Sequence, residues 1–211
     1  MNGFFSDLGR ELVAVLPAVP AILWALSFHE FCHAWVAARC GDNTAERAGR
    51  MTLNPLAHFD PWGLLCLLFF HFGWAKPVPI DPRYFRQPRR DIMLVSIAGI
   101  VGNILTAVLF GALIRIIFKV HPIWIMNYGL RTVLLDFVVI NLNFAVFNLI
   151  PIPPLDGSKI LYTLLPPSSV RFIMWMERYS LILLLMLVYS GVVGRIMRPA
   201  VSFAFKLVMG F

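Results

Sequence analysis

The stretch Leu12–Ala38, LVAVLPAVPAILWALSFHEFCHAWVAA, decides the fold of this chain. It is apolar almost throughout, and its histidines and its single glutamate all lie in one pentad, His29–His33. A helix crosses about 30 Å of hydrocarbon with roughly 20 residues, so this stretch is long enough to span a membrane. We predict a spanning helix at about Glu11–Arg39, in which Pro17 and Pro20 either kink the helix or mark its true start.

Three further apolar runs repeat this pattern, at Ile92–Phe118, Val133–Ile150 and Tyr179–Val193. The chain of 211 residues is 59% hydrophobic and only 14% charged, whereas a soluble domain is roughly 45–50% apolar and about 25% charged. Such a chain cannot bury its apolar surface when it is surrounded by water. We therefore predict an all-α polytopic membrane protein with about four spanning helices.

The boundaries of the other helices follow from these runs and from the residues that break them. We expect spanning helices two to four at about residues 91–118, 132–150 and 170–193, and a short helix at 157–165. The tail, residues 195–211, is expected to be a short amphipathic or partly inserted segment. Because no internal repeat or linker is found, one membrane-embedded domain is expected over residues 1–211, with a core at about 11–165 and C-terminal helices at 170–211.

The stretch Cys40–Arg90 differs in kind from the apolar runs. It carries ten glycines and prolines, too many for a long helix. Within it, the apolar segment Trp62–Trp74 has only 13 residues, which is too short to span a membrane as a helix. We therefore expect a short re-entrant or β-like segment between the first and second spanning helices, covered by protein or facing water.

The positive charge of the chain lies mainly in the loops between the apolar runs. A net charge of +7 in a soluble protein would favour nucleic-acid binding, but here it indicates topology. Eight of the 18 Lys and Arg residues lie between the first and second spanning helices. By the positive-inside rule that loop is cytoplasmic and the N-terminus is outside. We therefore expect a lipid bilayer as the surroundings and no nucleic-acid partner.

The pentad His29-Glu30-Phe31-Cys32-His33 matches the HExxH pattern. Two histidines four residues apart on a helix differ by about 40° in azimuth, so both imidazoles can reach one Zn²⁺ and the glutamate can take a proton from a water. Ionisable residues inside an apolar helix are costly in lipid and are functional by default. The alternative is a pair of helix histidines that hydrogen-bond to neighbours, in a sensor or a structural metal site.

A catalytic zinc needs three protein ligands and one open position. Asp156 is the favoured third ligand, because it follows the proline-rich break Pro151–Pro154 and because Gly157 permits a turn that aims its carboxylate inward. Depth agrees, since the pentad lies about 27–33 Å along the first helix and Asp156 follows the end of the third, which runs the same way. The other candidates lack such context: Glu46, His58, His71, Asp136 and Glu177.

These residues resemble the site-2 protease family of intramembrane metalloproteases, in its minimal form without PDZ or CBS domains. The resemblance covers most of the chain, from the first helix to about Leu165. It is carried by the HExxH pentad, by Leu155-Asp156-Gly157, and by the segments Gly49–Pro55 and Gly73–Pro79, which are similar to short bacterial members. Gly99–Asn103 departs from the pattern, because the family often has a proline after the first glycine.

The resemblance implies an intramembrane zinc endopeptidase that binds one Zn²⁺ per chain through His29, His33 and Asp156, with Glu30 as the general base. Asn148 matches a family asparagine that orients the substrate or stabilises the oxyanion. The implied partner is a transmembrane protein substrate, in a bacterial cytoplasmic membrane with the active site toward the cytoplasm. The alternative is a noncatalytic metal-binding membrane protein, such as a sensor or an inactive protease homologue, which would have no use for a base. A transporter would show symmetric repeats, and the sequence has none.

Two further expectations concern the polar groups around the site. Asn103, Asn141 and Asn148 line a wet cavity that supplies water for hydrolysis, or else Asn103 and Asn141 hydrogen-bond between helices. Lys76–Ile80 is either a strand edge that pairs with an unwound substrate through residues 76, 78 and 80, or a plain loop along the membrane surface.

Overall fold

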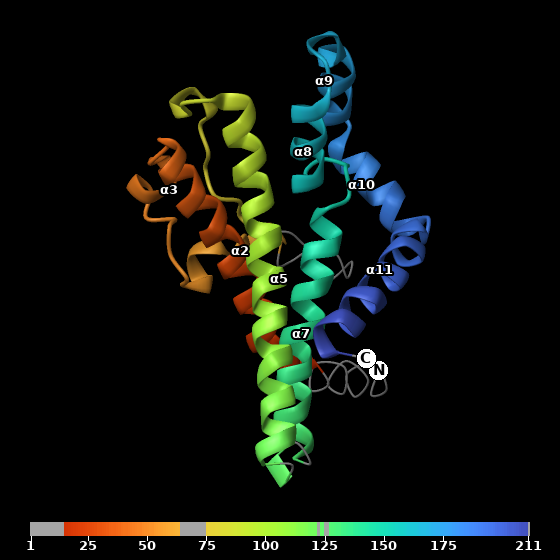
Figure 1. Ribbon diagram of the computed structural model, residues 1–211. Coiled ribbons are helices and arrows are strands. Elements are labelled where there is room, and N and C mark those ends of the chain that lie inside the picture. Colours follow the sequence, from red (N-terminus) through yellow and green to blue (C-terminus); the bar gives the residue numbers. More distant parts are fainter. Residues whose placement is uncertain (1–14, 64–74, 122, 125–126, 211) are drawn as a thin grey trace, which may run out of the picture.

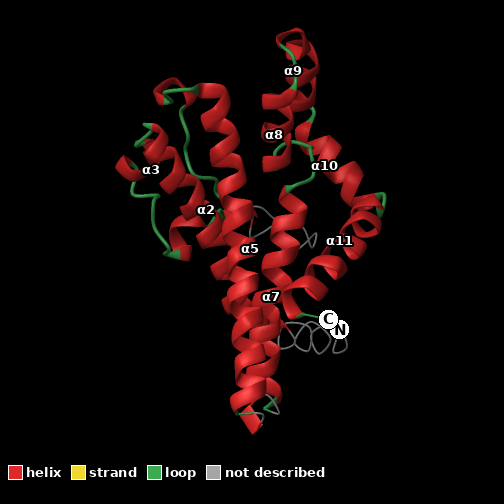
Figure 2. Cartoon of the chain, viewed as in Figure 1, coloured by secondary structure: helices red, strands yellow, loops and turns green. Residues whose placement is uncertain are grey.

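The computed structural model describes residues 15–63, 75–121, 123–124 and 127–210. All regular structure in these residues is helical (Figure 2). The long helices are α2 (Val19–Cys40), α5 (Pro88–Val120), α7 (Tyr128–Asn148) and α11 (Val192–Met209). The short helices are α3 (Thr44–Arg47), α8 (Asp156–Leu164), α9 (Val170–Arg178) and α10 (Ser180–Tyr189). Four 3₁₀ turns lie at Leu16–Ala18, Pro55–His58, Pro82–Tyr84 and Pro167–Ser169.

The helices α2, α5 and α7 contact one another and form the centre of the molecule (Figure 1). α5 runs in the direction opposite to α2 and α7. A buried apolar cluster joins α5 to α7 and is covered by α11; its members are Ala107, Ile114, Leu134, Val138 and Leu142. The outer face of α5 exposes large apolar side chains such as Leu105, Leu109 and Phe118, as expected of a helix that faces lipid.

Two of the described helices, α5 and α7, are long and apolar enough to cross a membrane. A third crossing is counted if Pro167–Arg178 and Ser180–Tyr189 are taken together, although this pair bends by 66°. The helix α2 has 22 residues but is not among them, because the His and Glu side chains of its HExxH pentad lower its mean hydropathy. The membrane-capable, all-helical class is confirmed, and two or three of the four predicted crossings meet these criteria.

The breaks in the chain bring the pentad and Asp156 to the same end of the helix bundle. α2 ends at Cys40 because Gly41 takes a left-handed conformation (φ 110°) and its N–H bonds to the carbonyls of the last turn. After α7 ends, Pro151, Pro153 and Pro154 prevent the helix from continuing, and a new helix, α8, begins at Asp156. Since α2 and α7 run in the same direction, the chain after α7 returns to the depth of the pentad.

The helix predicted at 170–193 is not continuous, because the chain forms α9 and α10 with a bend of 66° between them. The physical reason is the change in composition: α9 carries Arg171, Glu177 and Arg178, whereas α10 has no charged residue and is apolar from Leu181 to Val188. The tail expected to be a short segment is the helix α11, which packs back against α5 and α7. The helices predicted at 91–118, 132–150 and 157–165 are confirmed as α5, α7 and α8, within a few residues at each end.

The segment between α2 and α5 is only partly described. Most of the predicted re-entrant segment, residues 64–74, lies outside the described residues. Ala75–Asp81, which we call the strap, has neither helix nor strand, so the β-like prediction is not supported in the part of the segment that the structure describes.

Candidate metal centre

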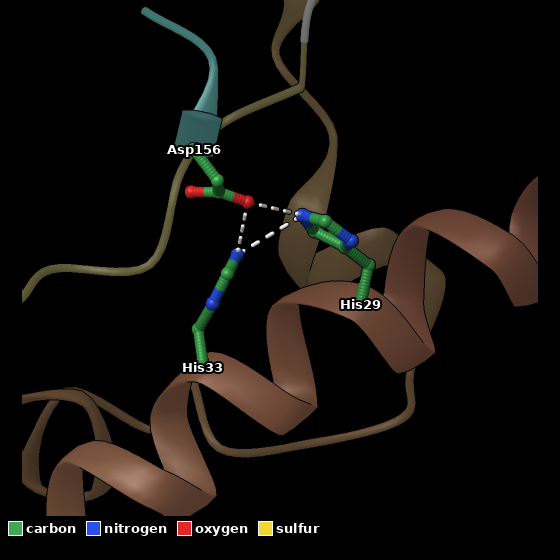
Figure 3. Close-up of side chains that lie close together, drawn as sticks. All are labelled: His29, His33 and Asp156. Atoms are coloured by element: carbon green, nitrogen blue, oxygen red, sulfur yellow. Dashed lines mark hydrogen bonds and ion pairs between the residues drawn. The ribbon is translucent and has the colours of Figure 1, made fainter. Parts of the chain in front are cut away.

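Two histidines from α2 and one aspartate from the start of α8 meet in a buried cluster (Figure 3). Nε2 of His29, Nε2 of His33 and Oδ2 of Asp156 lie 3.0 Å from one another. Their residues are only 4%, 5% and 4% exposed. Among the described residues, these three form the one group of His, Cys, Asp and Glu side chains close enough to share a metal ion.

The ring of His29 is oriented by an amide on α5. Its Nδ1 lies 2.7 Å from Oδ1 of Asn103. The amide nitrogen of Asn103 donates to the Ala25 carbonyl at 3.0 Å and to Oδ1 of Asn141 at 2.9 Å, so the oxygen of Asn103 must face the imidazole. An oxygen can only accept, and Nδ1 of His29 therefore carries the ring proton.

The ring of His33 is oriented in the same way by backbone. Its Nδ1 lies 2.7 Å from the Val95 carbonyl, which can only accept. Both histidines therefore hold their protons on Nδ1, and both Nε2 atoms present lone pairs to each other and to the Asp156 carboxylate. Supporting hydrogen bonds of this kind are typical of metal-bound histidines.

Three acceptor atoms at this separation repel one another unless a cation lies among them. A tetrahedral zinc site, with ligand atoms about 2.0–2.2 Å from the ion, places those atoms about 3.3 Å apart. Two imidazole nitrogens and one carboxylate oxygen are also a donor set of catalytic zinc sites, in which the fourth position stays open. The residues present therefore fit a zinc ion.

The close approach of α5 to the two imidazoles depends on Gly99. A Cβ at this position would lie 2.6 Å from Cε1 of His29 and 2.7 Å from Cε1 of His33, well inside van der Waals contact. Neither ring can move away freely, because Asn103 and Val95 hold their Nδ1 atoms. Only glycine lets α5 supply these two acceptors at hydrogen-bonding distance.

The position of Asp156 depends on Gly157 in a comparable way. A Cβ on Gly157 would lie 2.3 Å from the Leu149 carbonyl oxygen and 2.6 Å from that of Ile150. These are backbone atoms at the end of α7, so they cannot rotate away as a side chain could. Gly157 therefore lets the first turn of α8 lie against the end of α7, with the Asp156 carboxylate toward the histidines.

The carboxylate of Glu30 is bound by the strap. Its Oε2 accepts a hydrogen bond of 2.9 Å from the Val78 N–H. The N–H of Lys76, two residues earlier, donates to the His58 carbonyl at 3.0 Å. Of the two interpretations of Lys76–Ile80, the structure favours the plain loop, because the N–H groups of Lys76 and Val78 both have partners within the protein.

Two buried charged residues fasten the strap at its two ends. Nη2 of Arg50 donates to the Lys76 carbonyl at 2.7 Å and to the Pro77 carbonyl at 3.3 Å. At the other end, Oδ2 of Asp42 accepts from the Asp81 N–H at 2.7 Å. Asp42 is fully buried and Arg50 is 9% exposed, so both act in a protected environment. They fix the segment that holds Glu30.

The remaining candidates lie outside the cluster. Nδ2 of Asn148 donates to the Phe144 carbonyl of its own helix at 3.0 Å, and Asn148 is not one of the three clustered residues. Asn103 and Asn141 hydrogen-bond to each other between α5 and α7, which agrees with the interpretation that they join helices. The rejected ligands are also separate: Glu46 and Glu177 are exposed, Asp136 lies within α7, and buried His58 bonds to the Thr52 carbonyl. His71 lies outside the described residues.

Sequence reasoning missed four residues that support the site, namely Asp42, Arg50, Val78 and Gly99. For Gly99 a signal was present, because Gly99 and Gly102 lie three residues apart on a spanning helix, and small residues one turn apart permit close helix packing. For Arg50 and Val78 the signal was the pair of segments Gly49–Pro55 and Gly73–Pro79, whose physical connection is the bond from the Arg50 side chain to the strap.

Comparisons with known proteins find a peptidase family and relatives named as zinc metalloproteases. The model of "Peptidase family M50" matches residues 111–187. "Putative zinc metalloprotease YwhC" of Bacillus subtilis is 35% identical over 186 residues, which cover 87% of this chain and 85% of that protein. "Putative zinc metalloprotease Rip2" is 30% identical in Mycolicibacterium smegmatis and 32% in Mycobacterium tuberculosis, over 82% and 78% of this chain and 66% and 63% of those proteins. No solved structure matches the chain significantly.

Replacing Gly99 tests how far the positions of the two histidines depend on the close approach of α5. We expect Gly99→Ala to lower zinc affinity about 10- to 100-fold, because the new methyl group displaces imidazoles whose supporting hydrogen bonds it disrupts. Zinc content of the purified protein, measured by mass spectrometry against a competing chelator, gives the affinity. The matched control is Gly194→Ala on α11, where an added Cβ meets nothing within 4 Å. Wild-type zinc affinity in Gly99→Ala would contradict the close approach described.

Proposed function

Because the chain belongs to peptidase family M50, the site-2 protease family of zinc metalloproteases, we propose that it hydrolyses a peptide bond within or next to a membrane-embedded segment of another protein. The observation that carries the proposal is the buried convergence of His29, His33 and Asp156, with Glu30 on the same helix turn. A site that only bound metal would need the three ligands, but it would have no use for a carboxylate held beside them.

In this proposal His29, His33 and Asp156 hold one Zn²⁺ per chain. When bound, zinc polarises a carbonyl oxygen and lowers the pKa of a water toward 7. Glu30 accepts the proton of the attacking water and delivers it to the leaving nitrogen. The hydrogen bond from Val78 to Oε2 keeps the carboxylate in one orientation during both transfers.

Asn148 is proposed to donate a hydrogen bond to the developing oxyanion or to the substrate backbone. Its amide nitrogen uses one hydrogen for the Phe144 carbonyl, so the second remains for this purpose. The residue stands at the last position of α7, before the break that leads to Asp156. A change of side-chain rotamer on substrate binding would bring it toward the reacting carbonyl.

The proposed location is a bacterial cytoplasmic membrane, with the active site toward the cytoplasm. The basic residues that precede α5 and begin it, among them Arg83, Arg86, Arg89 and Arg90, lie at the end of the bundle that also holds α8. By the positive-inside rule this end faces the cytoplasm. The substrate is then a transmembrane protein whose cleaved bond comes within reach of that face.

The roles of Glu30 and Asp156 are tested by zinc content and by cleavage of a model transmembrane substrate. We expect Glu30→Gln to keep about one zinc per chain and to lose at least about 10²-fold in kcat, because the proton acceptor is gone. Asp156→Ala should lose zinc as well as activity, because only two ligands remain. Asp136→Asn, a carboxylate change within α7, is the control and should retain both. Cleavage by Glu30→Gln at the wild-type rate would refute the mechanism.

The role of Asn148 is tested with a neighbour on the same helix. Asn148→Ala should lower kcat by about 10²–10³, the usual effect of removing one oxyanion donor, with zinc content unchanged. Asn143, whose side chain also bonds back to its own helix at Val139, provides the matched control. Single-turnover cleavage rates measure the effect. Equal losses in Asn143→Ala and Asn148→Ala would show a general effect on α7 and exclude the specific role.

The strap provides a test of how Glu30 is positioned. Arg50→Met keeps an unbranched side chain but removes both hydrogen bonds to the strap, so kcat should fall about 10- to 100-fold as Val78 and Glu30 lose their alignment. Zinc content and KM should remain near wild type. The exposed Arg47, on α3, serves as the control in Arg47→Met. A change in KM alone would instead place Arg50 in substrate binding.

A further inference from the structure

A cavity of about 610 Å³ lies between the strap, the N-terminal part of α5 and α8. Its apolar wall is formed by Val78 and Ile80 of the strap and by Ile92 and Val95 of α5. A space of this size exceeds what one side chain fills and falls in the usual range of ligand sites. The volume therefore suits a short stretch of extended peptide.

The cavity borders the supports of the catalytic groups. Val78, in its wall, binds the Glu30 carboxylate through its N–H, and Val95 binds His33 through its carbonyl. On the α8 side the wall includes Lys159, whose Nζ lies 3.4 Å from Oδ1 of Asp156. The cavity therefore lies beside the residues that support Glu30, His33 and Asp156.

A specific pair of contacts joins the two helices that line the cavity. The guanidinium of Arg89, at the start of α5, donates to the Thr163 carbonyl at 2.8 Å and also to the Leu165 carbonyl. These bonds tie α5 to the end of α8 and set the width of the space between the two helices. The cavity is thus a built feature of the fold.

A buried hydroxyl in the wall has no partner within the described residues. Ser96 is 1% exposed and lines the cavity, and its Oγ makes no hydrogen bond there. A helix serine usually returns its hydroxyl to a carbonyl four residues earlier, and a buried hydroxyl without a partner is costly. An acceptor on a ligand that reaches this hydroxyl would satisfy it.

Tyr162 on α8 places a second hydroxyl in the wall. Burial, with a smaller contribution from the nearby Glu177 carboxylate, raises the pKa of this phenol to about 12. It therefore stays protonated at physiological pH and keeps its capacity to donate. An unwound segment of a membrane helix presents the matching chemistry, namely large apolar side chains and backbone carbonyls that have lost their helical donors.

We propose that this cavity binds the substrate residues on one side of the scissile bond in extended form, with a large apolar side chain against Ile80 and Ile92 and a backbone carbonyl accepting from Ser96. The inference rests on the proposed endopeptidase function and adds a substrate class to it: segments with a large aliphatic or aromatic residue at one fixed position beside the cleaved bond.

The size preference is tested with a model transmembrane substrate that carries Ala, Leu, Phe or Trp at each of three positions on either side of the mapped cleavage site. Wild type should prefer the large residues at one position. Ile92→Trp fills the cavity and should lower kcat/KM for the Trp substrate relative to the Ala substrate by at least about tenfold. Leu109→Trp, on the exposed face of the same helix, should keep the wild-type ratio. An unchanged ratio in Ile92→Trp at every position overturns the proposal.

Removal of the Ser96 hydroxyl gives a second readout. If a substrate carbonyl is its partner, Ser96→Ala lowers kcat/KM about two- to tenfold, the usual range for one neutral hydrogen bond, without lowering the melting temperature of the free protein. Unchanged kcat/KM in Ser96→Ala overturns the assignment of the hydroxyl.

A binding measurement separates failure of this inference from failure of the proposed function. A photo-crosslinking residue placed at position 92 in the Glu30→Gln protein should capture the substrate, whereas the same residue at position 109 should not. Capture without any wild-type cleavage supports the cavity and refutes the endopeptidase. Normal cleavage without capture at position 92 leaves the endopeptidase intact and overturns the cavity.

Discussion

Nε2 of His29, Nε2 of His33 and Oδ2 of Asp156 lie 3.0 Å from one another inside an apolar helix bundle, and each presents a lone pair to the other two. The fold must hold these atoms together against their mutual repulsion until a cation neutralises it. The fold does so through rigid parts: the turn of α2 that spaces His29 and His33, the prolines that end α7 before Asp156, and the glycine of α5 that admits both imidazoles. Each of these parts fixes the position of at least one of the three side chains.

Polar groups at membrane depth must be satisfied within the protein, and the centre of this bundle shows how. Asn103 alone serves three partners, since its oxygen faces His29 and its nitrogen bonds to the Ala25 carbonyl and to Asn141. One amide thereby fixes the tautomer of His29 and joins α2, α5 and α7. Its complete burial makes the network costly to break, because no water can replace a lost partner.

The sequence predicted the parts that local chemistry determines. The HExxH spacing placed both histidines on one face, and the prolines before Asp156 located the turn that returns to them. The bend between α9 and α10 was not predicted, because hydrophobicity alone does not show where the chain changes direction. The roles of Arg50 and Val78 were missed because they arise from contacts between segments 26 to 48 residues apart, and no local pattern encodes such a contact.

The strap links the chemistry of the site to the shape of the space beside it. Val78 lines the cavity while its N–H binds the Glu30 carboxylate, so an occupant of the cavity would contact the segment that orients Glu30. The prolines at 77 and 79 remove the donors that would otherwise compete for a partner, and Arg50 and Asp42 fasten both ends. The backbone N–H of Val78 thereby connects the orientation of the Glu30 carboxylate to the wall of the cavity.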